Sequence, residues 1–369
     1  MAEPGRRDVL AHDAYLARRH YPGLDAIRAA AVLIVMTWHV NSGMLHRLLG
    51  YRGVQWFFVL SGFLITTLCL AEEERHGRVS LRGFLVRRGH RILPLYAIAL
   101  AANAVYDLVL VRYGERTDAW ASYWPLYLVM MQELPLLLGW TVDYTPFPPA
   151  WSLAIEEKFY LVWPPLAFAL LRRARVALVV SLMTVVALIT LIRPDTVPSR
   201  LTSPYFSILI GCGLAMALRN PVTYRWLSAL LRWWIVPVAA TVAVLIPWDW
   251  EVYHGVALVV YPLMIALVLG GMVVSTADDA FEHPWAVWIG QRSYAIYLFH
   301  NLVFRSVDQV IEQVAFPERL RGWTVLVVGG AITFVLADVL RRVVEQPMIA
   351  RGRRLAARTP SPGQSIATT

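Results

Sequence analysis

Arg28 and His39 are polar residues in the long apolar stretch 24–45 near the start of the chain. They stand 11 positions apart, which on a helix is about three turns, so both side chains should share one face, roughly 16 Å apart along the axis. Polar groups in a membrane-spanning stretch are costly and by default indicate function. A histidine there can act as a general base. The alternatives are an arginine that reaches the membrane surface and a histidine satisfied by a neighbouring helix.

Two adjacent acids, Glu156 and Glu157, lie near the start of another apolar stretch, 149–171. They point about 100° apart on a helix, so at most one of them faces the same partner as His39. We expect Glu156 at a depth similar to that of His39, where a carboxylate would orient the imidazole and raise its basicity. The alternative is that both acids are interfacial and that Lys158 neutralises one of them.

Two further groups of residues are candidates for substrate binding. Arg88 and Arg91 are i,i+3 neighbours that could hold a phosphate-rich ligand with two guanidinium groups. From their spacing alone, the favoured interpretation is that these two arginines orient the chain in the membrane and bind lipid headgroups. In the second group, Tyr294, Tyr297 and Asn301 share a helix face and His300 lies to one side. An aromatic belt with interhelical hydrogen bonds explains that group as well as a substrate channel does.

The composition indicates the environment that these residues share. Of 369 residues, 58% are hydrophobic and 16% charged, against about 25% charged in an ordinary soluble domain. These values exclude a disordered chain and favour a polytopic membrane protein over a soluble enzyme. The net charge of +9 does not indicate nucleic acid, because the arginines cluster between apolar stretches, as in cytoplasmic loops. Two cysteines inside apolar stretches predict neither a disulfide framework nor a metal site.

The elements that position these residues are eleven apolar stretches, all expected to be helices because open strands cannot satisfy their backbone in lipid. With both termini inside, the basic loops require an even number of crossings between Arg91 and Arg172. We therefore predict an all-α bundle of about ten spanning helices plus one re-entrant or interfacial segment at 120–140, interrupted by Gln132, Glu133 and Pro135. The stretches are 24–45, 54–71, 94–111, 120–140, 149–171, 176–192, 204–218, 234–248, 255–275, 293–312 and 322–340.

Taken in order along the chain, these motifs resemble the acyltransferase family 3 membrane proteins. Each motif alone is weak, but their order over residues 21–347 is specific. The matching segments are Tyr21 to His39 with its arginine, ten residues and histidine; Gly53 to Ile65; Arg88 with Arg91; Trp151-Ser152-Leu153 with Glu156; Ser293-Tyr294 through His300; and Arg342 to Pro347. Asn301 departs from the pattern, because many members carry another residue after the histidine.

The resemblance implies O-acylation of a hydroxyl on a carbohydrate or a macrolide sugar, with acyl-CoA as co-substrate and no bound cofactor. It implies that His39 is the catalytic histidine, that Arg28 is its required partner and that Glu156 is an acid/base or orienting residue. It also implies that Arg88 and Arg91 lie on the side where the acyl-CoA donor binds. We expect the remaining candidates to contact substrate: Trp151, Ser152, Tyr294, Tyr297, His300 and Asn301.

The expected organisation is a cytoplasmic tail at 1–20, an acyltransferase domain at 21–347 and a basic, disordered tail at 348–369. The protein should lie in a bacterial cell membrane with both termini in the cytoplasm. Three questions stay open. His39 can act as a general base or carry the acyl group covalently. The chain can be a transporter or flippase without chemistry, although it lacks a visible internal repeat. It can also be a partner that supplies substrate to another enzyme.

Overall fold

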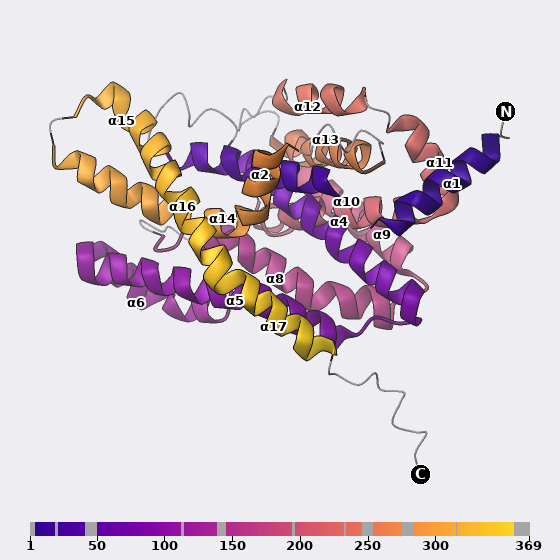
Figure 1. The fold of residues 1–369 in the computed structure, drawn as a ribbon, viewed down its shortest axis with the longest axis horizontal. Coiled ribbons are helices and arrows are strands. Elements are labelled where there is room, and N and C mark those ends of the chain that lie inside the picture. Colours follow the sequence, from indigo (N-terminus) through magenta and orange to yellow (C-terminus); the bar gives the residue numbers. More distant parts are fainter. Residues whose placement is uncertain are drawn as a thin grey trace, which may run out of the picture. The chain divides into compact units, whose positions relative to one another are not determined.

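The computed structural model describes residues 4–18, 21–40, 50–111, 114–138, 145–193, 196–231, 234–245, 254–274, 283–314 and 316–357. Within these ranges the regular secondary structure is helical, with no strand (Figure 1). The all-α prediction is therefore confirmed for the described residues. The physical reason is that a helix satisfies its own backbone groups, which lipid cannot do.

The chain divides into two compact units. The first unit comprises residues Met1–Trp38, Arg47–Ala71 and Arg173–Ser293. Its apolar core collects buried side chains such as Phe63, Ile27 and Leu269. Its helices are α1 (Pro4–Ala17), α2 (Pro22–Trp38), most of α4 (Gly50–His76), α9 (Arg175–Ile192), α10 (Val197–Arg219), α11 (Pro221–Leu230), α12 (Ile235–Leu245), α13 (His254–Val274) and the start of α14 (Pro284–Glu312).

The second unit comprises residues His39–His46, Glu72–Arg172 and Tyr294–Thr369. It contains most of the predicted site residues. Within it, α17 packs along α5, far away in sequence (Figure 1). Its helical elements, besides the larger part of α14, are α5 (Leu81–Val105), η1 (Tyr106–Val111), α6 (Gly114–Leu128), α7 (Leu134–Leu137), α8 (Ala150–Pro165), η2 (Leu166–Leu170), α15 (Glu318–Thr324), η4 (Val325–Gly329), α16 (Gly330–Leu340), η5 (Arg341–Glu345) and α17 (Gln346–Ala357).

Five described helical stretches are long and apolar enough to cross a membrane, and a sixth is possible if the bent pair Thr202–Arg219 and Pro221–Leu230 forms one span. The protein is therefore a multi-pass membrane protein, but the predicted count of about ten crossings is not confirmed. Some predicted stretches form shorter helices: α2 has 17 residues and α12 has 11. The five are Arg52–His76, Leu81–Val109, Arg175–Ile192, Gly255–Val274 and Glu318–Ala357.

The stretch predicted at 120–140 is broken where its sequence indicated. Helix α6 ends at Leu128 and the four-residue helix α7 begins at Leu134. Between them the chain turns, and Met130 adopts a positive φ of 53°. The interruption is confirmed, while the placement of this segment as re-entrant or interfacial stays a prediction.

The tail predicted as disordered from residue 348 is wrong in its first part, because α17 continues as a helix to Ala357. Gly352 explains how α17 lies so close to α5: a Cβ at this position would lie 2.7 Å from the Cβ of His90. The basic residues that suggested a solvated tail therefore sit on a helix packed by one face. The rest of the predicted tail, 358–369, lies outside the described residues.

Helices α4 and α10 cross closely at a pair of glycines, Gly62 and Gly211. A Cβ on Gly62 would lie 1.9 Å from the carbonyl oxygen of Ile208, and one on Gly211 would lie 2.1 Å from that of Val59. Both distances are too short for any side chain. Small residues at membrane helix interfaces permit this kind of approach.

Gly211→Ala should therefore destabilise the protein by about 1–3 kcal/mol, the usual cost of overpacking. Gly213→Ala on the same helix is the matched control, because its Cβ would first meet the Met183 sulfur at 3.7 Å. Thermal unfolding of both variants in detergent checks the expectation. Equal melting temperatures for the two variants would contradict the close crossing.

Candidate active site

His39 and His300 form the centre of the candidate site in the second unit. Helix α2 ends at Trp38, one residue before His39, which lies in a turn and is half-buried. The sequence Asn41-Ser42-Gly43 that follows contains weak helix formers. The His39 Nδ1 and His300 Nε2 atoms are 3.1 Å apart, and the two rings meet edge to face at 4.7 Å between centroids.

His300 is fixed in place by the helix that carries it. Its side chain is completely buried, and its Nδ1 lies 2.8 Å from the carbonyl oxygen of Tyr297 and 3.1 Å from that of Ile296. These carbonyls belong to the preceding turn of α14, so the ring folds back along its own helix. His39, by contrast, keeps part of its surface exposed. Of the two imidazoles, His39 is therefore the one that a substrate can reach.

Helices α8 and α14 meet at Ser152 and Tyr297, two of the predicted substrate contacts. Their hydroxyl oxygens are 2.6 Å apart, and the Tyr297 ring centroid lies 6.0 Å from that of His300. One turn further along α8, Glu156 accepts a hydrogen bond of 2.9 Å from the Tyr160 hydroxyl. Trp151, beside Ser152, is half-buried. Tyr297 thus connects Ser152 of α8 with His300 of α14.

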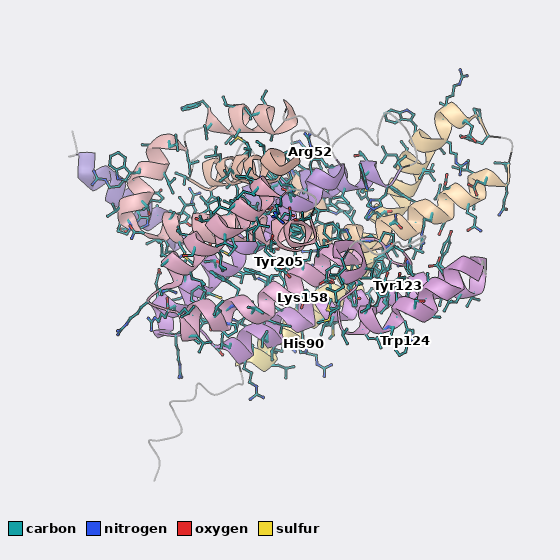
Figure 2. The ribbon with its side chains drawn as sticks, turned by 180° about the vertical axis from the view of Figure 1, so that it is seen from behind. Arg52, His90, Tyr123, Trp124, Lys158 and Tyr205 are labelled. Atoms are coloured by element: carbon teal, nitrogen blue, oxygen red, sulfur yellow. The ribbon has the colours of Figure 1, made fainter. Side chains whose placement is uncertain are left out.

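Lys158, which Figure 2 labels, pairs with Glu133. The sequence alone also allowed it to neutralise Glu156 or Glu157. The Lys158 Nζ is 2.5 Å from the Glu133 carboxylate and also donates to the backbone carbonyls of Met130 and Ala154. Its hydrogen-bonding capacity is thereby used. The structure therefore does not support the view that this lysine compensates its neighbours on α8, and the adjacent acids stay available for chemistry.

The paired arginines lie in a polar cluster rather than in an isolated basic patch. The Arg88 guanidinium lies over the rings of Phe84 and Tyr160, at 5.8 and 5.4 Å from their centroids. It also lies within electrostatic range of Glu157, and Arg91 lies within range of Tyr294. The cluster brings Arg88 near Glu157 of α8 and Arg91 near Tyr294 of α14, which spacing along α5 could not reveal.

Tyr294 and Asn301, two of the residues predicted to contact substrate, have different surroundings. The Tyr294 hydroxyl donates to the Ile92 carbonyl at 2.9 Å and so joins α14 to α5. Asn301 is buried, with 8% of its surface exposed, and its Oδ1 has no hydrogen-bond partner among the described residues. An unsatisfied buried acceptor is unusual. It lies one residue after His300 and can accept a hydrogen bond from a bound molecule.

Arg28 belongs to the first unit, where it forms an ion pair with Asp25 at 2.6 Å, one turn earlier on α2. Asp25 occupies the first turn of α2, a position where the helix dipole favours an acid. The start of α14 approaches this turn closely, since a Cβ on Gly290 would lie 2.0 Å from the Asp25 carbonyl oxygen. The predicted partnership between Arg28 and His39 stays a prediction.

A buried charged network in α5, η1 and α14 was missed in the sequence. Asp107 is completely buried and accepts a hydrogen bond of 3.0 Å from the Trp120 indole. Arg305 lies 3.5 Å from Asp107 and donates to Asn103 at 3.0 Å. The signal was present: an acid and an arginine stood in two stretches predicted to span the membrane, where such charges pair with one another.

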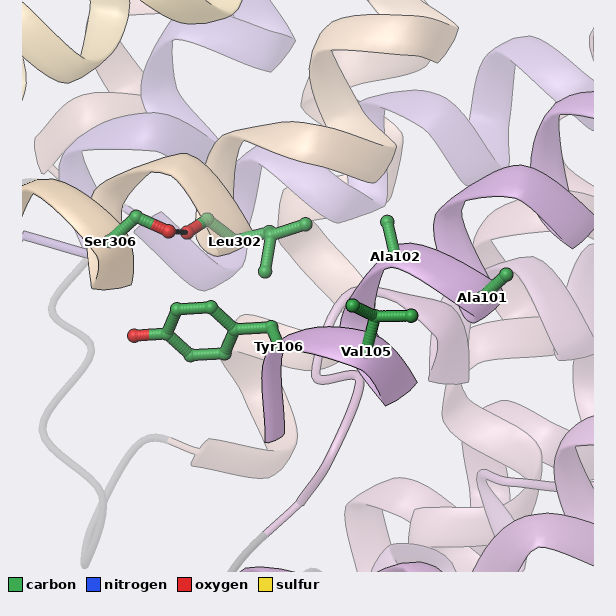
Figure 3. A pocket seen from close by; sticks show the side chains of 6 residues that line it. All are labelled: Ala101, Ala102, Val105, Tyr106, Leu302 and Ser306. Atoms are coloured by element: carbon green, nitrogen blue, oxygen red, sulfur yellow. Dashed lines mark hydrogen bonds between the residues drawn. The ribbon is translucent and has the colours of Figure 1, made fainter. Parts of the chain in front are cut away.

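A shallow groove of about 400 Å³ opens beside this network, between α5 with η1 and the C-terminal half of α14 (Figure 3). Its lining is mainly apolar, and Ser306 uses its hydroxyl within its own helix, on the Leu302 carbonyl. His39 is not among the lining residues. The residues that line the groove are Ala101, Ala102, Val105, Tyr106, Leu302 and Ser306.

Three curated proteins are similar to the chain over most of its length. It is 27% identical to the peptidoglycan O-acetyltransferase OatA of Listeria monocytogenes, over 91% of this chain and 57% of that protein. It is 30% identical to the putative peptidoglycan O-acetyltransferase YrhL of Bacillus subtilis, over 92% and 56%. It is 26% identical to the O-acetyltransferase OatA of Staphylococcus aureus, over 95% and 61%. The chain thus spans under two thirds of the length of these relatives.

No solved structure matches the chain at a significant level. The family evidence therefore comes from sequence alone, and it covers the described helices from α2 to α16. The profile of the acyltransferase-domain family matches residues 21–342, a range that includes every predicted site residue. The chain therefore belongs to the acyltransferase 3 family.

Proposed function

We propose that the protein is a membrane-bound O-acyltransferase. It moves an acyl group, with acetyl as the first candidate, from acyl-CoA to a hydroxyl of a sugar-containing acceptor. The observation that carries the proposal is the contact between His39 and the buried His300, beside the hydrogen-bonded Ser152 and Tyr297. In a chain of this family, a reachable imidazole held by a second one is suited to removing a proton from an alcohol.

In the proposed reaction, His39 takes the proton from the acceptor hydroxyl while the hydroxyl oxygen attacks the carbonyl carbon of the thioester. The tetrahedral adduct then collapses, the carbon–sulfur bond breaks, and the proton passes from the His39 imidazolium to the departing CoA thiolate. The products are the O-acyl ester and CoA. Base catalysis of this kind contributes about 10²–10⁴-fold, and positioning of the two substrates supplies much of the rest.

Arg88 and Arg91 are proposed to hold the phosphates of CoA at the cytoplasmic end of α5. Two guanidinium groups one helical turn apart suit bidentate phosphate recognition. We infer that the acceptor is an envelope or exopolysaccharide, since the named relatives include peptidoglycan O-acetyltransferases; a macrolide sugar is the other acceptor of this chemistry.

The proposed location is a bacterial plasma membrane, with both chain termini on the cytoplasmic side. The support is the distribution of arginines, which follows the positive-inside rule. Arg351, Arg353 and Arg354 lie on exposed positions of α17, and Arg172 and Arg173 follow η2 at the end of another apolar stretch. On this orientation, acyl-CoA enters from the side on which it is made.

The experiment that tests the function uses the full-length protein in lipid nanodiscs with acetyl-CoA and peptidoglycan fragments. We expect CoA release that depends on the acceptor, together with an alkali-labile acetyl ester on the sugar, detected by mass spectrometry. If the acetyl group of acetyl-CoA is labelled and the acceptor is omitted, label that stays on the protein would instead indicate an acyl-His39 intermediate. Movement of unmodified glycan across the bilayer, without any ester, would favour a transporter and overturn the proposal.

A further inference from the structure

The hydrogen-bond partners of His300 determine which of its ring nitrogens carries a proton. A backbone carbonyl oxygen can only accept a hydrogen bond. The Nδ1 atom of His300 lies 2.8 and 3.1 Å from two such oxygens, those of Tyr297 and Ile296. If Nδ1 carried no hydrogen, its lone pair would point at the lone pairs of these two oxygens, which is repulsive. The Nδ1 atom of His300 is therefore the protonated one.

The other nitrogen of His300 is then an acceptor. The hydrogen-bond neighbours of this ring among the described residues are two carbonyl oxygens and one imidazole, none of which carries a negative charge. A completely buried ring in such surroundings is neutral, because burial disfavours an uncompensated charge. A neutral imidazole protonated at Nδ1 has its lone pair at Nε2, and this atom faces His39.

We propose that His300 is a positioning residue that sets the tautomer of His39. Since the His300 Nε2 can only accept, the His39 Nδ1 at 3.1 Å must donate to it. The neutral His39 ring then has its lone pair at Nε2, and Nε2 is the atom that takes the proton. This inference rests on the proposed function, in which His39 is the base, and it goes further by naming the basic atom and the residue that selects it.

The pair has a second consequence once the acceptor hydroxyl has lost its proton. His39 is then an imidazolium, and its Nδ1 hydrogen still points at the His300 lone pair. A hydrogen bond to the charged form favours that form. His300 therefore stabilises the charge that develops on His39, and it does so as a neutral group. This role is usually taken by a carboxylate in a catalytic triad, and here no charge needs to be buried.

Burial separates the roles of the two rings. His300 is 0% exposed and His39 is only half-buried, so a substrate meets His39 and His300 acts through it. Glu156, the orienting residue expected from the sequence, has Tyr160 as a hydrogen-bond partner at 2.9 Å. The positioning residue of this proposal, His300, comes from α14, more than 250 positions from His39 along the chain, and the role expected for Glu156 stays a prediction.

Two substitutions of nearly equal size separate this role from packing. In His300→Gln, the amide oxygen can occupy the place of the imidazole Nε2 and accept from His39. In His300→Asn, the shorter amide can reach the carbonyls of α14 but not His39. We expect His300→Gln to retain transfer within about tenfold of the wild type, because its amide oxygen still accepts from the His39 Nδ1 and only the geometry of one neutral hydrogen bond changes. We expect His300→Asn to lose about 10²–10⁴-fold, as for a wrong tautomer.

The direct measurement is the ¹⁵N spectrum of ring-labelled histidine in the full chain in nanodiscs. Nine histidines contribute, and the His39 signals are those that vanish in His39→Gln. We expect a protonated Nδ1 and an unprotonated Nε2 on His39 in the wild type and in His300→Gln, and loss of this preference in His300→Asn. A His39 protonated at Nε2 in the wild type would overturn the proposal.

Failure of this inference is distinguishable from failure of the proposed function. If His39→Ala still transfers acyl groups, the base is another residue and the proposed mechanism fails, whatever the tautomer. If His39→Ala is inactive while His300→Asn turns over like the wild type, the function stands and the role of His300 is wrong. Equal losses of activity and of melting temperature in both His300 variants would show that the residue only packs.

Discussion

Replacing His39 by alanine is expected to reduce acyl transfer by about 10²–10⁴-fold, the range that general-base catalysis contributes. The substitution removes the imidazole that accepts the hydroxyl proton, while the helix before it, α2, keeps every residue it has. Insertion and folding should therefore be normal. The measurement is acceptor-dependent CoA release in nanodiscs, with the amount of folded protein checked by size-exclusion chromatography.

The control for this variant is His283→Ala. His283 is exposed, and its ring lies tilted against that of Trp285 at the start of α14, with 5.4 Å between ring centroids, so its loss removes one imidazole at little structural cost. We expect turnover of this control near the wild-type value. If the His39→Ala variant turned over as fast as this control, the His39 imidazole would not be the catalytic base.

Replacing Lys158 by methionine is expected to destabilise the protein by about 3–5 kcal/mol, the usual cost of leaving one member of a buried ion pair alone. Glu133 is only 3% exposed and would lose the ammonium group that lies 2.5 Å away. The same change frees the turn around Met130, whose carbonyl oxygen accepts from Lys158. Thermal unfolding in detergent measures the effect.

The reverse substitution, Glu133→Met, should cost less, because the Lys158 side chain is 26% exposed and can hydrate its charge. The double variant Glu133→Met with Lys158→Met should recover most of the stability lost by Lys158→Met alone, since apolar replacement of a whole buried pair is often neutral. A double-mutant cycle compares these three variants. Additive losses in that cycle would contradict the pairing.

The ion pair also bears on the chemistry of α8. This helix carries Ser152 and Glu156, and Lys158 fixes it to the turn between α6 and α7. Because Lys158 is engaged there, the carboxylates of Glu156 and Glu157 have other partners: Tyr160 for the first and Arg88, within electrostatic range, for the second. The polar groups of α8 are thus divided between a structural pair and the candidate site.

Helical structure and most element positions could be predicted from the sequence, because apolar stretches in lipid must satisfy their backbone internally. The interruption near Gln132 and Glu133 followed from their polarity. The helical tail, α17, was misjudged because its charged composition resembles a solvated segment, whereas Gly352 lets one face pack against α5. The predicted count of about ten crossings is not confirmed, because a stretch such as α12, with 11 residues, is too short to span a membrane as a single helix.

By itself, the sequence determined the class of protein and the residue types available for chemistry: a polytopic helical protein with His39, Ser152, Glu156 and His300 in apolar surroundings. Only the tertiary structure decided which of them meet. It paired His39 with His300 and Ser152 with Tyr297, and it assigned Lys158 to Glu133. The physical reason is that periodicity reports which face of its own helix a residue occupies, whereas the partner across that face depends on how distant helices pack.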